Sequence, residues 1–218
     1  MSSIVKENYL KALYFLNEES SQISMTELSK RLAVSKPTAN HMIKSLEEKG
    51  WVIYEKYKPV ILTDQGKKAA ALIIRKHRLT EMFLHKVMDF GWEEVHEIAE
   101  QMEHIDSDEL FRRMDEMLGQ PQIDPHGSPI PDEQGNITEQ EYISLTQIAP
   151  GEMARLAALS NSSSELLEYL NECGIELGSV IELIKVEPFD KSCTISCEGK
   201  PYIMVSQKVA MSLLMDTI

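Results

Sequence analysis

The chain has 218 residues, of which 43% are hydrophobic, so it can bury a sizeable core in one large domain or in two to three small ones. No apolar run reaches the ~20 residues that span a bilayer, and the first residues lack a secretory cleavage site. We therefore expect a cytoplasmic protein without membrane contact. The three cysteines are an odd set that suits reduced thiols better than a disulfide framework.

Charge is distributed unevenly along the chain. The net charge of −13 by itself disfavours nucleic acid as a partner. Residues 1–78, however, contain 14 Lys and Arg against 8 Asp and Glu, a net charge of +6, so the remainder carries −19. A basic N-terminal part followed by an acidic remainder fits a DNA-binding domain joined to a cation-binding domain. Ordinary variation in surface charge is the simpler explanation, but the size of the contrast favours the first one.

The first 63 residues have the pattern of a winged helix-turn-helix. Apolar residues recur at helical spacing over residues 5–17, and a short helix is predicted over residues 25–32. A third helix is predicted over residues 35–49, with a serine cap and with Pro37 in its first turn, where a missing N–H costs nothing. A hairpin over residues 52–62 completes the pattern.

The third of these helices would enter the major groove of duplex DNA with its N-terminal residues near base edges. Its short or planar polar side chains can donate to and accept from the bases, and they are Ser35, Thr38, Asn40 and His41. The ring of Pro37 could meet a thymine methyl. Phosphate contacts are expected from Lys36, Lys44, Lys56 and Lys58. A winged helix used only for protein contacts, with Ser35 as a plain cap, is the less favoured alternative.

Residues 64–140 are predicted to form a helical region followed by a linker. Helices are expected over residues 64–90, 93–101 and 106–118, and Pro, Gly, Asp and Gln are frequent from 119 to 140. The helices carry more apolar surface than one layer can hide. A homodimer is the economical explanation, and a two-fold dimer would match a palindromic operator. Coverage by a third domain is the alternative.

Histidines and glutamates recur in this helical region at spacings of three, four and seven, which places them on one face of a helix. These residues are His77, Glu81, His96, Glu100, Glu103 and His104. Imidazoles and carboxylates that converge from two helices are ligands for divalent metals of the borderline-to-hard kind. One such residue would usually be a solvated surface group, so the hypothesis depends on the six acting together.

The last third of the chain is predicted to be a small β-barrel. Five short β-like runs lie between residues 142 and 206, with one helix among them at residues 163–174. A domain of about seventy residues is typical of the smallest independently folding units.

At this point the chain resembles the diphtheria-toxin-repressor family of metal-dependent repressors, which includes the manganese transport regulators. The motifs that carry the resemblance are Glu7-Asn8-Tyr9-Leu10, Ser35-Lys36-Pro37-Thr38, Leu62-Thr63-Asp64-Gln65-Gly66, Arg75-Lys76-His77-Arg78-Leu79-x-Glu81, His96…Glu100-x-x-Glu103-His104 and Gly127-x-Pro129-Ile130-Pro131. They follow one another over residues 5–131, and the last third matches only in outline.

The resemblance implies a mainly α fold with small β parts and three domains. These are a winged helix-turn-helix DNA-binding domain at 1–63, a helical metal-binding and dimerisation domain with linker at 64–140, and an SH3-like (FeoA-like) module at 141–218.

The resemblance also implies two metal sites. A regulatory site would use Glu100, Glu103 and His104, with Asn8 facing them from the first helix. Relatives have Met or Asp at the position of Asn8, and an amide oxygen can still ligate but adds no charge.

A second site would use His77, Glu81 and His96. Asp124 occupies a loop position that supplies a ligand in some manganese-responsive relatives, and it could restore at the regulatory site the carboxylate that Asn8 lacks. His126, close by, is more typical of a turn than of a ligand.

The function implied by the resemblance is metal-dependent repression of metal-uptake genes, with no enzymatic activity. Glu100 stands where iron-responsive relatives have a cysteine, and a carboxylate in place of a soft thiolate favours a harder ion. The expected cofactor is therefore Mn²⁺, with Fe²⁺ as the alternative. A metal-dependent hydrolase is a distant rival, because no HExxH motif, nucleophile elbow or phosphate loop is present. A regulator that senses an organic ligand in the C-terminal module is a second rival.

Overall fold

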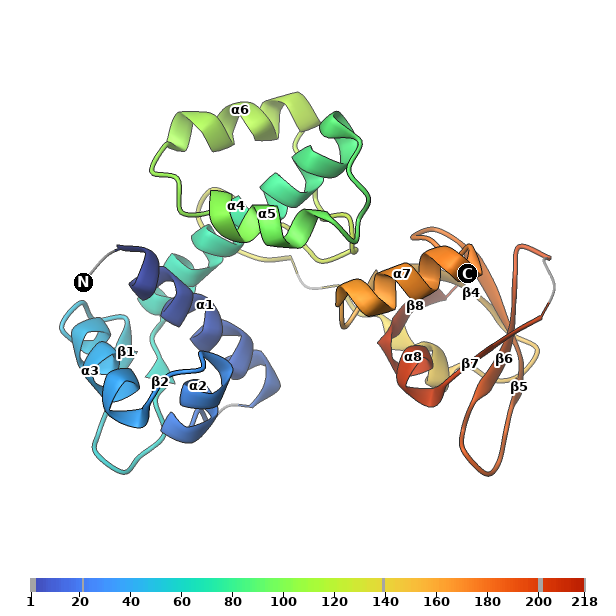
Figure 1. Ribbon diagram of the computed structural model, residues 1–218, viewed down its shortest axis with the longest axis horizontal. Helices are drawn as coiled ribbons and strands as arrows, with labels where there is room; N and C mark the ends of the chain where they lie inside the picture. Colours follow the sequence, from blue (N-terminus) through green and yellow to red (C-terminus); the bar gives the residue numbers. More distant parts are fainter. Residues whose placement is uncertain (1–2, 21, 139, 200–201, 218) are drawn as a thin grey trace. The chain divides into compact units, whose positions relative to one another are not determined.

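The computed structural model describes residues 3–20, 22–138, 140–199 and 202–217 (Figure 1). The chain divides into two compact units. The first unit comprises Met1–Thr80, Ala99–Gln120 and Ile130–Thr138, and the second comprises Glu81–Ile98, Pro121–Pro129 and Glu139–Ile218. Among the described helices, none has both the length and the apolar character needed to cross a membrane.

The first unit begins with the helix-turn-helix that the sequence predicted. Its elements are α1 (Ser3–Glu19), α2 (Met25–Arg31), α3 (Lys36–Glu47) and an antiparallel hairpin of β1 (Val52–Ile53) and β2 (Ile61–Leu62). Ser24 and Glu27 form a capping box at the start of α2. The Ser35 hydroxyl caps α3 by accepting the N–H of Thr38 at 3.3 Å. Because each cap satisfies backbone groups that a helix terminus leaves unpaired, the helices begin where the caps stand.

Each of these three helices buries one apolar face. Leu10 and Leu13 of α1 pack in one core with Leu28 of α2 and with Ile43 and Leu46 of α3. Burying a Leu or Ile side chain fully contributes about 1.5–3 kcal/mol, so this core fixes the orientation of α3. The first turn of α3 and the tip of the hairpin stay exposed.

The helical region contains α4 (Asp64–Met88), α5 (Val95–Met102) and α6 (Asp108–Leu118). The helix expected over residues 93–101 begins two residues later and ends at Met102, so Glu103 and His104 stand in the following turn. The N–H of Glu103 still donates to the Ala99 carbonyl at 2.9 Å, so the chain keeps the helical path for one more bond.

The second unit contains an antiparallel sheet with the strand order β3-β8-β4-β5-β6-β7. Its strands are β3 (Ile143–Ser144), β4 (Met153–Leu159), β5 (Val180–Val186), β6 (Cys193–Cys197), β7 (Ile203–Val205) and β8 (Leu213–Thr217). Helices α7 (Ser164–Cys173) and α8 (Gln207–Ser212) accompany it. Leu167 and Leu170 of α7 are buried in the same core as the sheet residues Leu156, Ile181 and Ile195.

One segment of this unit differs from the sequence expectation. The β-like run at 142–148 is a strand for two residues only, because Ser144 and Gln147 form a capping box that opens a 3₁₀ helix over Leu145–Gln147. The final run of the chain begins as α8, capped by Ser206, before β8 follows. The cysteines are free thiols, as expected.

The segment Pro121–Pro129 lies close to β4 within the second unit. The carbonyl of His126 accepts the N–H of Leu159 at 2.9 Å. Gly127 has a φ of +85°, and a Cβ added there would lie 2.3 Å from the Ala157 carbonyl oxygen. Only glycine allows this approach, which fixes the position of the neighbouring side chains Asp124 and His126.

We expect Gly127→Ala to lower the free energy of unfolding by roughly 2–4 kcal/mol, because strain at positive φ adds to the collision with β4. Gly178→Ala is the matched control, since its φ is +89° and its Cβ would meet nothing within 4 Å. The control should lose only about 1 kcal/mol. Urea unfolding of both variants measures the difference, and equal losses would contradict the close approach.

Candidate metal centre

A buried carboxylate, Glu103, is the centre of a group of polar side chains in the first unit. Its side chain is 0% exposed, and its Oε2 lies 2.6 Å from Nδ1 of His77. Nε2 of His104 lies 3.5 Å from the other oxygen, Oε1. His77, Glu100 and Glu103 each offer a ligand atom within 4.8 Å of one another. We call Glu7, Asn8, Lys11, His77, Glu100, Glu103 and His104 the first cluster.

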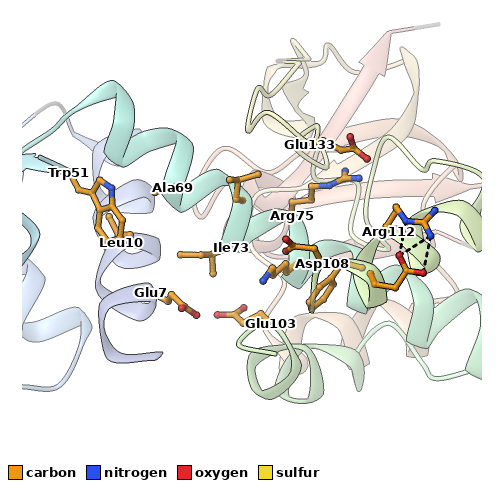
Figure 2. A pocket seen from close by; sticks show the side chains of 14 residues that line it. Glu7, Leu10, Trp51, Ala69, Ile73, Arg75, Glu103, Asp108, Arg112 and Glu133 are labelled. Carbon is orange, nitrogen blue, oxygen red and sulfur yellow. Dashed lines mark hydrogen bonds and ion pairs between the residues drawn. The ribbon is translucent and has the colours of Figure 1, made fainter. Parts of the chain in front are cut away.

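His104 is oriented by a carboxylate on α1. Its Nδ1 lies 2.7 Å from Oε2 of Glu7. A carboxylate only accepts, so in the neutral ring Nδ1 carries the proton and Nε2 keeps its lone pair on the side of Glu103. Glu7 and Glu103 line one cavity of about 650 Å³, and Figure 2 shows their carboxylates pointing toward each other.

Lys11 reaches the same cluster from the next turn of α1. Its Nζ lies 2.5 Å from Oε1 of Glu100 and 2.8 Å from each carboxylate oxygen of Glu103. The ammonium therefore bridges the two carboxylates. Together with Glu7, it connects α1 to the C-terminal end of α5.

Asn8 supplies a test of whether a metal ion fits here. Its Oδ1 is buried and has no hydrogen-bond partner among the described residues. A buried carbonyl oxygen without a donor costs about 1–3 kcal/mol, and a cation is a partner that would satisfy it. Asn8 lies on α1 between Glu7 and Lys11, which both contact this cluster. Carboxylate, imidazole and amide groups together form an O/N donor set that suits Mn²⁺ or Fe²⁺.

A second cluster, Glu81, Asp124 and His126, lies in the second unit. The three side chains are buried and offer ligand atoms within 4.8 Å of one another. Nε2 of His126 lies 2.8 Å from the carbonyl oxygen of Trp92, so in the neutral ring Nε2 is protonated and Nδ1 keeps the lone pair.

That Nδ1 lies 3.9 Å from Oε2 of Glu81 and 4.0 Å from Oδ1 of Asp124. These separations are too long for hydrogen bonds but fit ligand atoms that each lie about 2.0–2.2 Å from a shared ion. His96, half of whose side chain is exposed, approaches Glu81 with Nδ1 at 3.2 Å from Oε1. It could complete the same group.

The residues that the sequence predicted as ligands lie in these two clusters. Glu100 and Glu103 offer ligand atoms close to each other, and His104 lies beside Glu103. His77 contacts Glu103 of the first cluster, and the set of His77, Glu81 and His96 for the second site stays a prediction. Asp124, predicted for the regulatory site, lies instead beside Glu81. His126 lies in a turn, as predicted, and its side chain is buried beside these two.

Glu7 and Lys11 were absent from the prediction. The available signal was their spacing of four on α1, which puts an acid and a base on one face of a helix that otherwise buries leucines.

The predicted DNA contacts surround a groove of about 780 Å³ between α3 and the hairpin. Six of them line this groove, and they are Lys36, Pro37, Asn40, Lys44, Lys56 and Lys58. Thr38 and His41 are exposed on α3, and Ser35 is exposed at its N-cap. The hydroxyls of Ser35 and Thr38 lie 2.8 Å apart, and the Ser35 hydroxyl also accepts the N–H of Thr38 as the helix cap.

Three sequence families match the chain in order. Residues 1–60 match the N-terminal DNA binding domain of iron dependent repressors. Residues 63–132 match the metal binding and dimerisation domain of the same repressors. Residues 143–216 match the FeoA domain.

The chain is also similar to individual repressors. It is 35% identical over 125 residues to the iron-dependent repressor IdeR of Mycobacterium tuberculosis, a match that covers 57% of this chain but only about half, 54%, of that protein. It is 30% identical over 184 residues to the diphtheria toxin repressor of Corynebacterium jeikeium, covering 83% of this chain and 75% of that one. A solved manganese-dependent transcriptional repressor in complex with manganese superimposes with a TM-score of 0.87 at 31% identity, over 98% of this chain and 100% of the other.

We expect Glu7→Ala to weaken Mn²⁺ binding at the first cluster by roughly 10–100-fold, because His104 loses the carboxylate that orients its ring. Glu7→Gln is the matched control, since its amide oxygen still accepts from Nδ1, and it should lose less. Calorimetric titration with Mn²⁺ measures both affinities. Wild-type affinity in Glu7→Ala would show that Glu7 does not orient the ligand.

Proposed function

Because this chain belongs to the diphtheria toxin repressor family of metal-dependent repressors, we propose that it represses transcription by binding operator DNA when Mn²⁺ is bound. The family is one of transcriptional repressors and not of enzymes. The proposal includes a homodimer on a palindromic operator that controls metal-uptake genes.

The observation that carries this proposal is that α1 takes part both in the core of the helix-turn-helix and in the first cluster. Leu10 and Leu13 of α1 are buried in the core that holds α3. Glu7 and Lys11 of the same helix contact residues at the end of α5. A helix transmits a displacement along its length, so any change in the first cluster alters the support of α3.

A divalent cation held by Asn8, Glu100, Glu103 and His104 would supply positive charge among buried carboxylates. The protein's own groups do the rest. Glu7 orients the imidazole of His104, and Asn8 on the same helix has a buried oxygen without a hydrogen-bond partner among the described residues. Couplings between two binding sites are typically ~1–3 kcal/mol, which corresponds to a 5–150-fold change in DNA affinity.

The surface of the helix-turn-helix supports DNA as the partner. Lys36, Lys44, Lys56 and Lys58 line a groove with the polar amide of Asn40. Lysines position a protein on phosphates without reading sequence, whereas an Asn amide can pair with the edge of an adenine. The net charge of the chain is −13, so this local basic groove and not the whole surface would attract DNA.

Dimerisation is supported by the family that matches residues 63–132 and by exposed apolar side chains in the helical region. Leu72 and Met117 are exposed in the first unit, and Val87 and Met88 in the second. Exposed apolar side chains point to an interface when they form one contiguous patch, as two copies of these helices would require.

Mn²⁺ is the proposed metal because both clusters offer only oxygen and nitrogen. The three cysteines lie in the second unit at 173, 193 and 197, outside both clusters. Hard oxygen ligands suit Mn²⁺, and a site without thiolate favours it over later transition metals. Fe²⁺ is the alternative, favoured by the relatives named as iron-dependent repressors.

We further propose that the second metal site is built around Glu81. The set predicted from the sequence was His77, Glu81 and His96. In the structure, Asp124 and His126 also face Glu81, and His126 presents its unprotonated Nδ1. Asp124 additionally accepts the N–H groups of His126 and Ser128 through Oδ1, which holds the loop in place.

We expect Mn²⁺ to raise the affinity of the wild-type protein for a selected operator duplex by 5–150-fold, and Glu103→Ala and His104→Ala to abolish that gain. Glu109→Ala is the control, since Glu109 is an exposed acid of α6 that pairs with Arg112 and Arg113. Mobility-shift titrations with and without Mn²⁺ or Fe²⁺ measure the effect. Wild-type affinity that neither metal changes would sink the proposal.

A further inference from the structure

We propose that Lys11 sets the metal affinity of the first cluster by acting as a built-in cation that competes with the divalent ion. This inference rests on the proposed function, in that it takes the first cluster to be a metal site. Lys11 itself cannot be a ligand of the metal, because an ammonium has no lone pair to donate.

The contacts of Lys11 account for all of its hydrogen-bonding capacity. An ammonium has three N–H donors, and Nζ lies within 2.8 Å of three carboxylate oxygens, one on Glu100 and two on Glu103. The Lys11 side chain is 12% exposed and that of Glu103 is 0% exposed. Water therefore screens these charges only weakly.

This position gives Lys11 a definite role in stability. A buried carboxylate is costly unless a positive group pairs with it, and removal of one partner from a buried ion pair is strongly destabilising. Lys11 is the positive group that touches both oxygens of Glu103. The ammonium thus compensates Glu103 without any metal ion.

The same position works against metal binding. Lys11 contacts both carboxylate oxygens of Glu103 and one of the two oxygens of Glu100. A cation that uses them must displace Nζ or share the oxygens with it, and a charge of +1 repels a charge of +2 at this range. Lys11 therefore lowers the affinity of the cluster and raises the metal concentration at which it responds.

A purely mechanical role for Lys11 leads to the opposite expectation. If the lysine only tethers α1 to α5, its loss loosens the cluster and weakens metal binding. Competition predicts that its loss strengthens binding. The sign of the change in affinity separates the two roles.

The test is calorimetric titration of full-length variants with Mn²⁺. Lys11→Met keeps most of the side-chain length without the charge, and Lys11→Gln also keeps a donor for the carboxylates. Both should bind Mn²⁺ at least about tenfold more tightly than the wild type. Lys11→Arg should stay near the wild type. Lys67→Met, which removes an exposed charge from α4, is the matched control and should leave the affinity unchanged.

Thermal unfolding supplies a second readout. In a chelating buffer, Lys11→Met should melt at a lower temperature than the wild type, and Mn²⁺ should raise its melting temperature by more. If Lys11→Met fails to fold, Lys11→Gln carries the comparison. Folding of either variant only in the presence of Mn²⁺ also supports the proposal, because the ion then replaces the ammonium.

The two hypotheses fail in different ways. A wild-type protein that binds no Mn²⁺ overturns the proposed function. A wild-type protein that binds Mn²⁺, with unchanged or weaker binding in the Lys11 variants, overturns the competition and leaves the proposed function standing.

Discussion

The rest of the first unit depends on the buried carboxylate of Glu103. A carboxylate with no exposed surface must be paired, and three groups from separate segments meet it: Lys11 of α1, His77 of α4 and His104 of the turn after α5. Their common partner ties these elements together more specifically than apolar packing does, because charged hydrogen bonds require particular atoms at short range. Because Glu7 and Lys11 of α1 take part in these charged contacts, a change in the charge of the cluster changes the interactions that hold α1 in place.

The position of α1 connects this electrostatic constraint to the DNA-binding surface. One face of α1 packs under α3, and another face contacts the end of α5. In the second cluster, close backbone packing positions the ligands. The backbone of β4 approaches Gly127 and fixes the loop that carries Asp124 and His126. Both clusters offer oxygen and nitrogen in a buried setting, so they favour the same hard class of divalent ion.

The sequence predicted the helices and part of the site, for physical reasons that can be stated. Caps at Ser24 and Ser35 are local, so the starts of α2 and α3 could be read directly. The three-residue spacing from Glu100 to Glu103 keeps its meaning although α5 ends at Met102, because the N–H of Glu103 still donates to the Ala99 carbonyl. The pairing of Glu7 with His104 joins residues 97 positions apart, and no local pattern announces such a contact. Burial is likewise not visible in a local pattern. The residues around His126 predicted a turn, and only the fold shows that its side chain is buried beside Glu81 and Asp124.

The central claim is that metal at the first cluster and DNA at α3 share one free energy of coupling. Linkage requires the effect to be reciprocal, so the most direct measurement is the affinity for Mn²⁺ with and without a saturating operator duplex. The account predicts that the duplex tightens Mn²⁺ binding by the same factor by which Mn²⁺ tightens DNA binding. Equal affinities for Mn²⁺ in the two conditions would contradict it.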